Sequence, residues 1–162
     1  MSAPLTTPRE GPRPRPDANL GYLFRLAHQR FRSQLEDALR DFGLSAQGYG
    51  ILSVFETRDE LSTTELARVA QVTRQTIHAA ILELEAAGLL ERRPRNKRVV
   101  LVAPTKRGHR VLEAATRRVR AVERAALAGL TTDDEQAVRR WLAGLAAPSS
   151  PRADEPRERK SR

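Results

Sequence analysis

The segment 62–105 constrains the fold more strongly than any other part of this 162-residue chain. It begins with Ser62-x-x-Glu65, the pattern of a capping box, in which two side chains bond to the backbone amides of a first helical turn. Thr73 is predicted to cap a second short helix, and Gly88 is predicted to end it. Two short helices joined by a tight turn are typical of a helix-turn-helix.

A β-hairpin is predicted directly after these two helices. Residues 89–93 and 98–103 are short runs with strand character, the second rich in valine, on either side of a polar turn. Residues 92–98 contain five cations and no acidic residue. A helix-turn-helix followed by a charged hairpin, or wing, can touch duplex DNA in two places, so DNA binding is the leading interpretation.

Further helices are predicted where apolar residues recur every three or four positions. They cover about 19–41, 45–55, 105–127 and 132–145. The predicted fold class is therefore mainly α with a small β-wing. The first of these helices and the last two lie outside the winged unit, and their apolar faces need a partner, which is either a second subunit or their own domain.

Composition narrows the partners and excludes several classes of function. The net charge of +9 favours a polyanionic partner, usually nucleic acid, although charge can also serve solubility alone. Cysteine is absent, so disulfides and cysteine-ligated metals are excluded. The three histidines are scattered and no nucleotide-binding or hydrolase motif occurs, so we expect no enzyme activity, no cofactor and no metal site. Neither a signal peptide nor a membrane span is predicted, and a cytoplasmic location is expected.

The second helix of the motif carries the residues that could read base pairs. With its apolar stripe turned inward, the opposite face is exposed, and a recognition helix uses mainly its N-terminal residues on base edges. Gln75 can pair with adenine, and Arg74 with guanine or a phosphate. Hydroxyl groups at the helix start can donate to phosphates, whereas His78 either contacts DNA or faces solvent. The predicted contacts from the two helices are Ser62, Thr63, Thr73, Arg74, Gln75, Thr76 and His78.

The wing is the strongest electrostatic feature of the motif. Like charges in one short hairpin repel each other unless a polyanion neutralises them, and a cationic tip suits the narrow minor groove of A·T-rich DNA. A solubilising loop is the alternative. The predicted wing contacts are Arg92, Arg93, Arg95, Lys97 and Arg98.

Residues 20–145 resemble the MarR (multiple antibiotic resistance regulator) family of winged-helix transcription factors. The similarity is carried by LGYLFRLAHQRF, GLSAQGYGILSVF, STTELARVAQVTRQTIHAAILELEAAGLLER and RVVLVAPTKRG. The resemblance implies a homodimer held by its terminal helices, with two winged units on a pseudo-palindromic site in double-stranded DNA. It also implies, commonly, release from DNA by a small, often aromatic, effector, and it favours repression over activation.

Several positions depart from the family pattern. The family wing usually carries Asp-x-Arg where this chain has Asn96 and Arg98, so Arg98 inherits the minor-groove role without a bracing carboxylate. Leu82 stands where the family often has aspartate. Gln71 replaces a common turn glycine at a position where left-handed backbone is expected, which costs about 1 kcal/mol. These departures indicate that the protein binds a different operator sequence or binds DNA more weakly than is typical of the family.

The resemblance also places an effector pocket where the first, second and fifth helices meet. Aromatic side chains and one histidine from the first two helices are the candidates there: Tyr22, His28, Phe31, Tyr49 and Phe55.

Three parts are predicted along the chain. Residues 1–17, rich in proline and arginine, and residues 148–162 are expected to be disordered tails. Residues 18–147 are expected to form the MarR-like domain, in which 45–104 bind DNA and 18–42 with 105–147 make the dimer. The predicted function is a sequence-specific transcriptional regulator, and the alternative is a winged-helix module that binds an acidic protein partner.

Overall fold

The computed structural model describes residues 15, 17–95 and 100–147. The chain divides into two compact units, Met1–Ala126 and Leu127–Arg162. The predicted disordered tails lie almost entirely outside the described residues, as do wing residues 96–99. Within the described part of the chain, no helix is long and apolar enough to cross a membrane.

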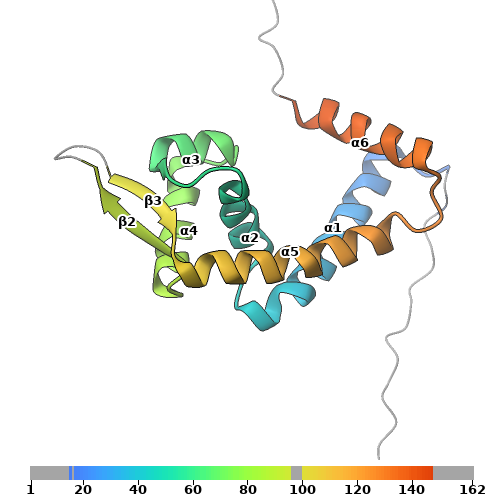
Figure 1. Ribbon diagram of the computed structural model, residues 1–162. Coiled ribbons are helices and arrows are strands. Elements are labelled where there is room, and N and C mark those ends of the chain that lie inside the picture. The colour runs from blue at the N-terminus through green and yellow to red at the C-terminus, as the bar shows by residue number, and fades with distance from the viewer. Residues whose placement is uncertain (1–14, 16, 96–99, 148–162) are drawn as a thin grey trace, which may run out of the picture. The chain divides into compact units, whose positions relative to one another are not determined.

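The first unit is mainly helical with one small sheet, as predicted (Figure 1). Its helices are α1 (Leu20–Leu39), α2 (Ala46–Ser53), α3 (Thr63–Val69), α4 (Arg74–Ala86) and α5 (Lys106–Ala126). Short 3₁₀ turns, η1 (Arg40–Phe42) and η2 (Val54–Glu56), extend α1 and α2. The strands are β1 (Leu61–Ser62), β2 (Leu90–Pro94) and β3 (Val100–Pro104). The second unit contains α6 (Thr132–Ala146).

Side chains cap α2, α3 and α4, and the caps of α3 and α4 are the predicted ones. Ser45 Oγ accepts the Gly48 N–H at 2.9 Å at the start of α2. Ser62 and Glu65 form the complete capping box at the start of α3. Thr73 Oγ1 accepts the Thr76 N–H at 3.1 Å at the start of α4. Each bond satisfies an amide that has no partner within its own helix, which explains why these helices begin where they do.

Residues with a left-handed backbone conformation lie where helices end and the chain turns. Gly43 and Gly88 have φ of 64° and 68°, and they follow η1 and α4. Gln71 lies between α3 and α4 with φ of 53°, and it is the one non-glycine residue with positive φ in the described part of the chain. The predicted left-handed conformation at Gln71 is therefore confirmed.

The sheet has three strands rather than the two that were predicted. Its order is β1-β3-β2, with both pairs antiparallel. β2 and β3 pair from Leu90 opposite Pro104 to Pro94 opposite Val100, and this hairpin is the wing, extending beside α4 (Figure 1). β1 pairs Leu61 with Val102 just before α3 begins. A two-residue strand leaves no alternating pattern in a sequence, so only its pairing with β3 reveals it.

One hydrophobic core joins the winged unit to α1 and α5. Val102 in the sheet and Ile77 and Ile81 on α4 are 0–1% exposed. The predicted inward face of α4 is confirmed, since Ile77, Ala80, Ile81 and Leu84 are all buried. The other largest fully buried side chains are Leu39, Ile51, Leu52, Leu66 and Leu89.

Burial fades toward the N-terminus of α1. Leu39 at its C-terminal end is fully buried, whereas Leu20, Tyr22 and Phe24 are 64%, 48% and 42% exposed. α6 likewise exposes its large apolar side chains, which are Val138, Trp141, Leu142 and Leu145. Each of these two helices therefore exposes large apolar side chains, and apolar surface of this kind is typical of a subunit interface.

Candidate nucleic-acid interface

The first turn of α4 presents a polar, solvent-exposed surface. Arg74, Gln75 and His78 are exposed, and Thr76 is half-buried. No ion pair or hydrogen bond within the described residues occupies the side chains of Arg74 or Gln75. Because the opposite face of α4 is buried in the core, the packing holds the helix in place and keeps this surface turned toward solvent.

Two hydroxyls cooperate at the start of α4. Thr73 Oγ1 and Thr76 Oγ1 lie 2.8 Å apart in a hydrogen bond. One of the two hydroxyl hydrogens is used in that bond, so the other remains available to a phosphate oxygen. Together with the N-terminal amides of α4, this corner is suited to bind an anion.

The start of α3 is organised differently. Ser62 Oγ donates to Glu65 Oε2 at 2.6 Å, so its hydrogen is already committed. The Ser62 side chain and backbone bond to the Glu65 carboxylate, and both hydrogen bonds lower the pKa of that group. Thr63, half-buried, makes no such side-chain bond within the described residues. Of the two predicted phosphate donors on this helix, Thr63 is therefore the better placed.

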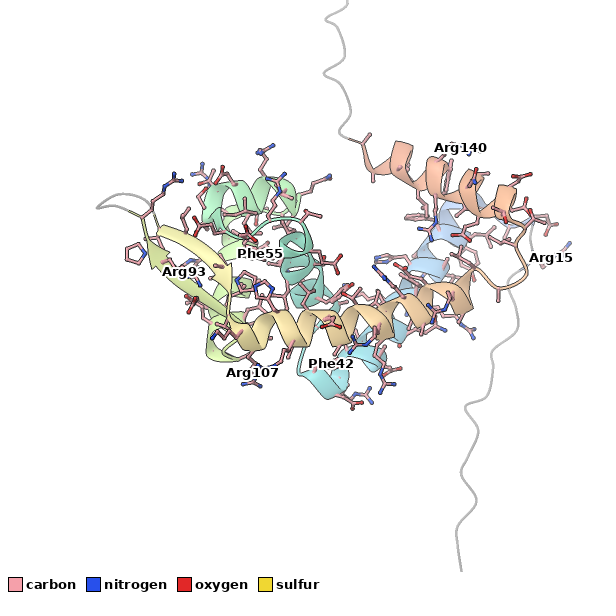
Figure 2. All side chains as sticks on the ribbon, viewed as in Figure 1. Arg15, Phe42, Phe55, Arg93, Arg107 and Arg140 are labelled. Atoms are coloured by element: carbon pink, nitrogen blue, oxygen red, sulfur yellow. The ribbon has the colours of Figure 1, made fainter. Side chains whose placement is uncertain are left out.

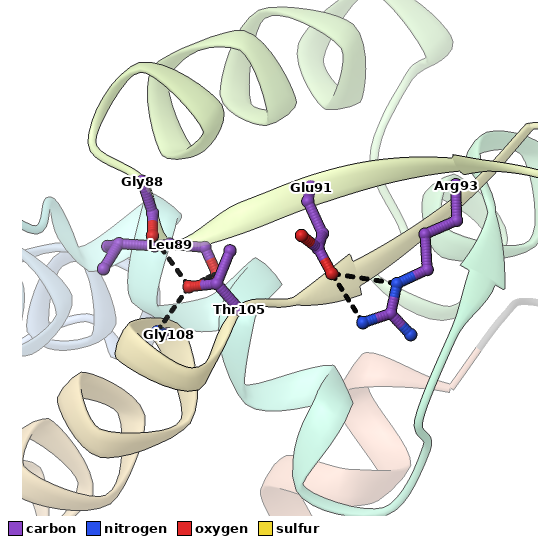
Figure 3. Close-up of polar contacts among 6 residues, drawn as sticks. All are labelled: Gly88, Leu89, Glu91, Arg93, Thr105 and Gly108. Atoms are coloured by element: carbon purple, nitrogen blue, oxygen red, sulfur yellow. Dashed lines mark hydrogen bonds and ion pairs between the residues drawn. The ribbon is translucent and has the colours of Figure 1, made fainter.

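Part of the wing's charge is neutralised by acidic residues that lie outside the predicted basic run. Arg92 Nε lies 3.0 Å from Glu85 Oε1 of α4, and Arg93 Nε donates to Glu91 Oε1 at 2.9 Å (Figure 3). Glu85 and Glu91 lie outside the seven-residue basic run, so counting charges within the run could not find them. Arg95 is exposed without an ion pair in the described region, and Lys97 and Arg98 lie outside it.

A hydrogen-bonded joint connects the end of α4 to the start of α5. Thr105 Oγ1 donates to the Gly88 carbonyl at 2.7 Å and accepts the Gly108 N–H at 2.9 Å (Figure 3). The Thr105 N–H donates to the Leu89 carbonyl at 3.0 Å. Gly108 is buried against Leu89, and a Cβ at Gly108 would overlap the Leu89 carbonyl oxygen. The joint holds α4 and the wing at a fixed position on α5.

The five predicted pocket residues do not share one environment. Phe55 is 4% exposed and belongs to the core, as its position inside the fold shows (Figure 2). Phe31 and Tyr49 are half-buried, whereas Tyr22 and His28 on α1 are exposed. The Tyr22 ring instead lies beside Arg25, whose guanidinium carbon is 5.3 Å from the ring centroid.

Tyr49 belongs to a polar cluster that the sequence did not indicate. Its hydroxyl lies 3.2 Å from Thr116 Oγ1 on α5, and Thr116 donates to Glu56 Oε1 at 2.7 Å. Burial raises the pKa of the Tyr49 phenol. Positions 49 and 116 are far apart in sequence, so no local pattern could have paired them. Among the described residues, no group of histidine, aspartate and glutamate side chains could hold a metal ion.

A capped, exposed recognition helix beside a basic hairpin defines the winged helix-turn-helix class. A model of the MarR family matches residues 42–98. The HTH-type transcriptional repressor Rv2887 of Mycobacterium tuberculosis is 32% identical over 131 residues, which are 80% of this chain and 94% of the repressor. This chain belongs to the MarR family of transcriptional regulators.

Solved structures agree with this assignment. A probable transcriptional regulator from Pseudomonas aeruginosa is 27% identical with a TM-score of 0.73, over 81% of this chain and 99% of that one. The M. tuberculosis MarR family protein Rv2887 in complex with salicylic acid is 32% identical with a TM-score of 0.62, over 80% and 98%.

Proposed function

We propose that this protein is a homodimeric, sequence-specific DNA-binding repressor of transcription, acting as a regulator rather than as an enzyme. The observation that carries the proposal is the first turn of α4, where Arg74 and Gln75 are exposed and have no partner among the described residues. Core packing and the joint at Thr105 hold this helix. The related repressor Rv2887 has been solved in complex with DNA, which supports DNA as the ligand. A cytoplasmic location remains a prediction.

The two copies would place their α4 helices in successive major grooves. Winged dimers of this kind bind half-sites about 10 bp apart. The hairpin tips would then lie in the flanking minor grooves, where arginine is favoured by the negative potential. The exposed apolar side chains of α1 and α6 supply the surface for dimerisation.

Fluorescence anisotropy with duplexes from the DNA flanking the protein's own gene tests the proposal. We expect one duplex to bind at least about a thousandfold more tightly than random DNA at physiological salt, as specific regulators do. Equal affinity for both duplexes would overturn the regulator assignment and favour the acidic-protein alternative.

Two substitutions separate base reading from phosphate contact. Gln75→Ala should relax the preference at one base pair per half-site, costing about 1–3 kcal/mol there. Arg98→Ala should weaken binding to all sequences and lower the slope of log affinity against log salt by about 1. An unchanged sequence preference in the first variant, or an unchanged slope in the second, would contradict the role given to that residue.

We further infer that a small aromatic acid releases the protein from DNA. Rv2887 has been solved with salicylic acid and with p-aminosalicylic acid. Tyr49, half-buried and bonded to Thr116, is the pocket candidate most closely integrated with α5. Salicylate added to the protein–operator complex should lower the anisotropy in a saturable way, and no effect up to millimolar salicylate would contradict this effector class.

A further inference from the structure

The positive charge of the folded region is concentrated on α5 rather than on the helix-turn-helix and wing. Residues 18–147 carry +6, because the segments 1–17 and 148–162 account for +1 and +2 of the total. α5 contains seven cations and two carboxylates, so it holds +5 of that +6. Residues 45–104, with eight cations and seven carboxylates, are nearly neutral.

Six of the cations on α5 share one side of the helix. At 3.6 residues per turn they fall within a sector of about 120°, and no acidic residue of α5 lies in that sector. All six are exposed, and Figure 2 shows Arg107 extending outward from the first turn. This basic face consists of Lys106, Arg107, Arg110, Arg117, Arg118 and Arg124.

Few carboxylates in the described part of the chain neutralise the basic face. Arg117 is paired with Glu113 at 2.6 Å. The other five cations have no carboxylate within ion-pair distance among the described residues. Unpaired like charges on one side of a helix repel each other, and binding of an external anion would relieve this repulsion.

The chemistry of the face favours a polyanion over a membrane or a protein. Gly108, Leu112, Ala115 and Val119 on the opposite side are buried in the core, so α5 has no apolar face with which to enter a lipid surface. No aromatic or large apolar side chain lies between the cations, although protein interfaces depend on such anchors. The cations from Lys106 to Arg124 span about 27 Å of helix, roughly the length of eight base pairs of duplex.

We propose that the basic face of α5 is a second duplex-binding surface, which neutralises backbone phosphates without reading sequence. The proposal rests on the proposed function in that DNA is taken as the polyanion. It assigns to α5 a large share of the salt-dependent attraction that brings the protein to DNA, while α4 supplies the sequence preference.

The test measures the affinity for a random-sequence 20-bp duplex between 50 and 200 mM salt. The variant is the triple substitution Arg107→Gln, Arg110→Gln and Arg118→Gln, in which glutamine keeps the helix propensity close to that of arginine. We expect the slope of log affinity against log salt to fall by about 2–3, and affinity at 50 mM salt to fall about tenfold or more.

Two control variants separate a local contact from the effects of folding and overall charge. Arg25→Gln, Arg139→Gln and Arg140→Gln together remove the same three charges elsewhere and should change the slope by less than about 1. The triple substitution Arg107→Lys, Arg110→Lys and Arg118→Lys keeps the charge and should keep the slope. An unchanged slope in the α5 glutamine variant would overturn the proposal, as would equal losses in that variant and the charge-matched control.

The same measurements distinguish a failure of the α5 proposal from a failure of the proposed function. If native protein binds the flanking and random duplexes equally while the α5 variant still loses slope, the regulator assignment fails and the α5 surface stands. If flanking DNA binds specifically while the slope on random duplex is unchanged, the α5 proposal fails and the regulator assignment stands.

Discussion

At the scale of single residues, backbone geometry rather than side-chain chemistry decides which residue fits at two positions, one between α3 and α4 and one on α5. Gln71 holds a left-handed conformation in the turn between α3 and α4. Gly108 lies where α5 touches the Leu89 carbonyl too closely for any side chain. At position 71 the backbone conformation is strained for glutamine and would suit glycine. At position 108 only glycine fits.

Gln71→Gly should therefore stabilise the protein. A non-glycine residue pays about 1–2 kcal/mol in the left-handed region, and glycine loses about 0.5–1 kcal/mol through the entropy of the unfolded chain. The net gain should be about 0.5–1 kcal/mol, a rise of about 1–4 °C in Tm by calorimetry. Ala70→Gly, one residue earlier at φ of −74°, should instead lower the Tm. A lower Tm for Gln71→Gly would contradict the strain at this turn.

Gly108→Ala should destabilise the fold by about 2 kcal/mol or more, because the added methyl meets backbone that cannot rotate away. The matched substitution is Gly50→Ala on α2, where nothing lies within 4 Å of the added Cβ. There alanine should stabilise by about 0.5–1 kcal/mol through its higher helix propensity. Denaturant unfolding of both variants gives the comparison, and equal effects would show that the Leu89 contact is relaxed in solution.

At the scale of elements, helix starts are set by short hydrogen-bonded motifs. α3 and α6 both begin with full capping boxes, Ser62 with Glu65 and Thr131 with Asp134. In each box the hydroxyl and backbone amide bond to the carboxylate and lower its pKa. A carboxyl group with a lowered pKa in the folded state stabilises the fold above its unfolded pKa, and that contribution is lost as pH falls through the folded pKa.

Glu65→Gln should expose this pH dependence. The variant should have a lower Tm than native protein at pH 7, because the charged carboxylate that bonds to Ser62 is gone. The difference should shrink as the pH falls below about 4.3, the ordinary pKa of glutamate, and vanish in stronger acid. Asp59→Asn, which removes an exposed carboxylate without a hydrogen bond in the described region, should show no such convergence. A Tm difference that does not change with pH would show that the charge of Glu65 does not contribute to stability through the bonds with Ser62.

At the scale of the whole molecule, the exposed apolar side chains of α1 and of α6 favour a dimer. Leu142→Glu places a charge within the exposed apolar face of α6. Light scattering after size exclusion should then show the mass of one 18.1 kDa chain rather than twice that value, together with loss of tight operator binding. Gln136→Glu adds the same charge at a polar, exposed position of α6 and should remain dimeric. A dimeric Leu142→Glu variant would place the interface elsewhere.

Local patterns predicted most of the elements in this fold. The caps at Ser45, Ser62 and Thr73 and the stop at Gly88 needed only the chemistry of a few neighbouring residues. β1 could not be predicted in this way, because two residues acquire strand geometry only through pairing with β3. The same holds for the bonds that join Tyr49 to Thr116 and Arg92 to Glu85, since each partner is contributed by a different element.

The sequence by itself determined where the helices start, which face of α4 turns inward and which residues stand at its exposed first turn, because capping and periodicity are local properties. Only the tertiary structure decided that Glu85 of α4 binds Arg92 of the wing and that Phe55 belongs to the core. It also placed five exposed cations of α5 out of reach of any described carboxylate. Charge neutralisation and burial depend on distances in space, and those distances are fixed only when the elements pack together.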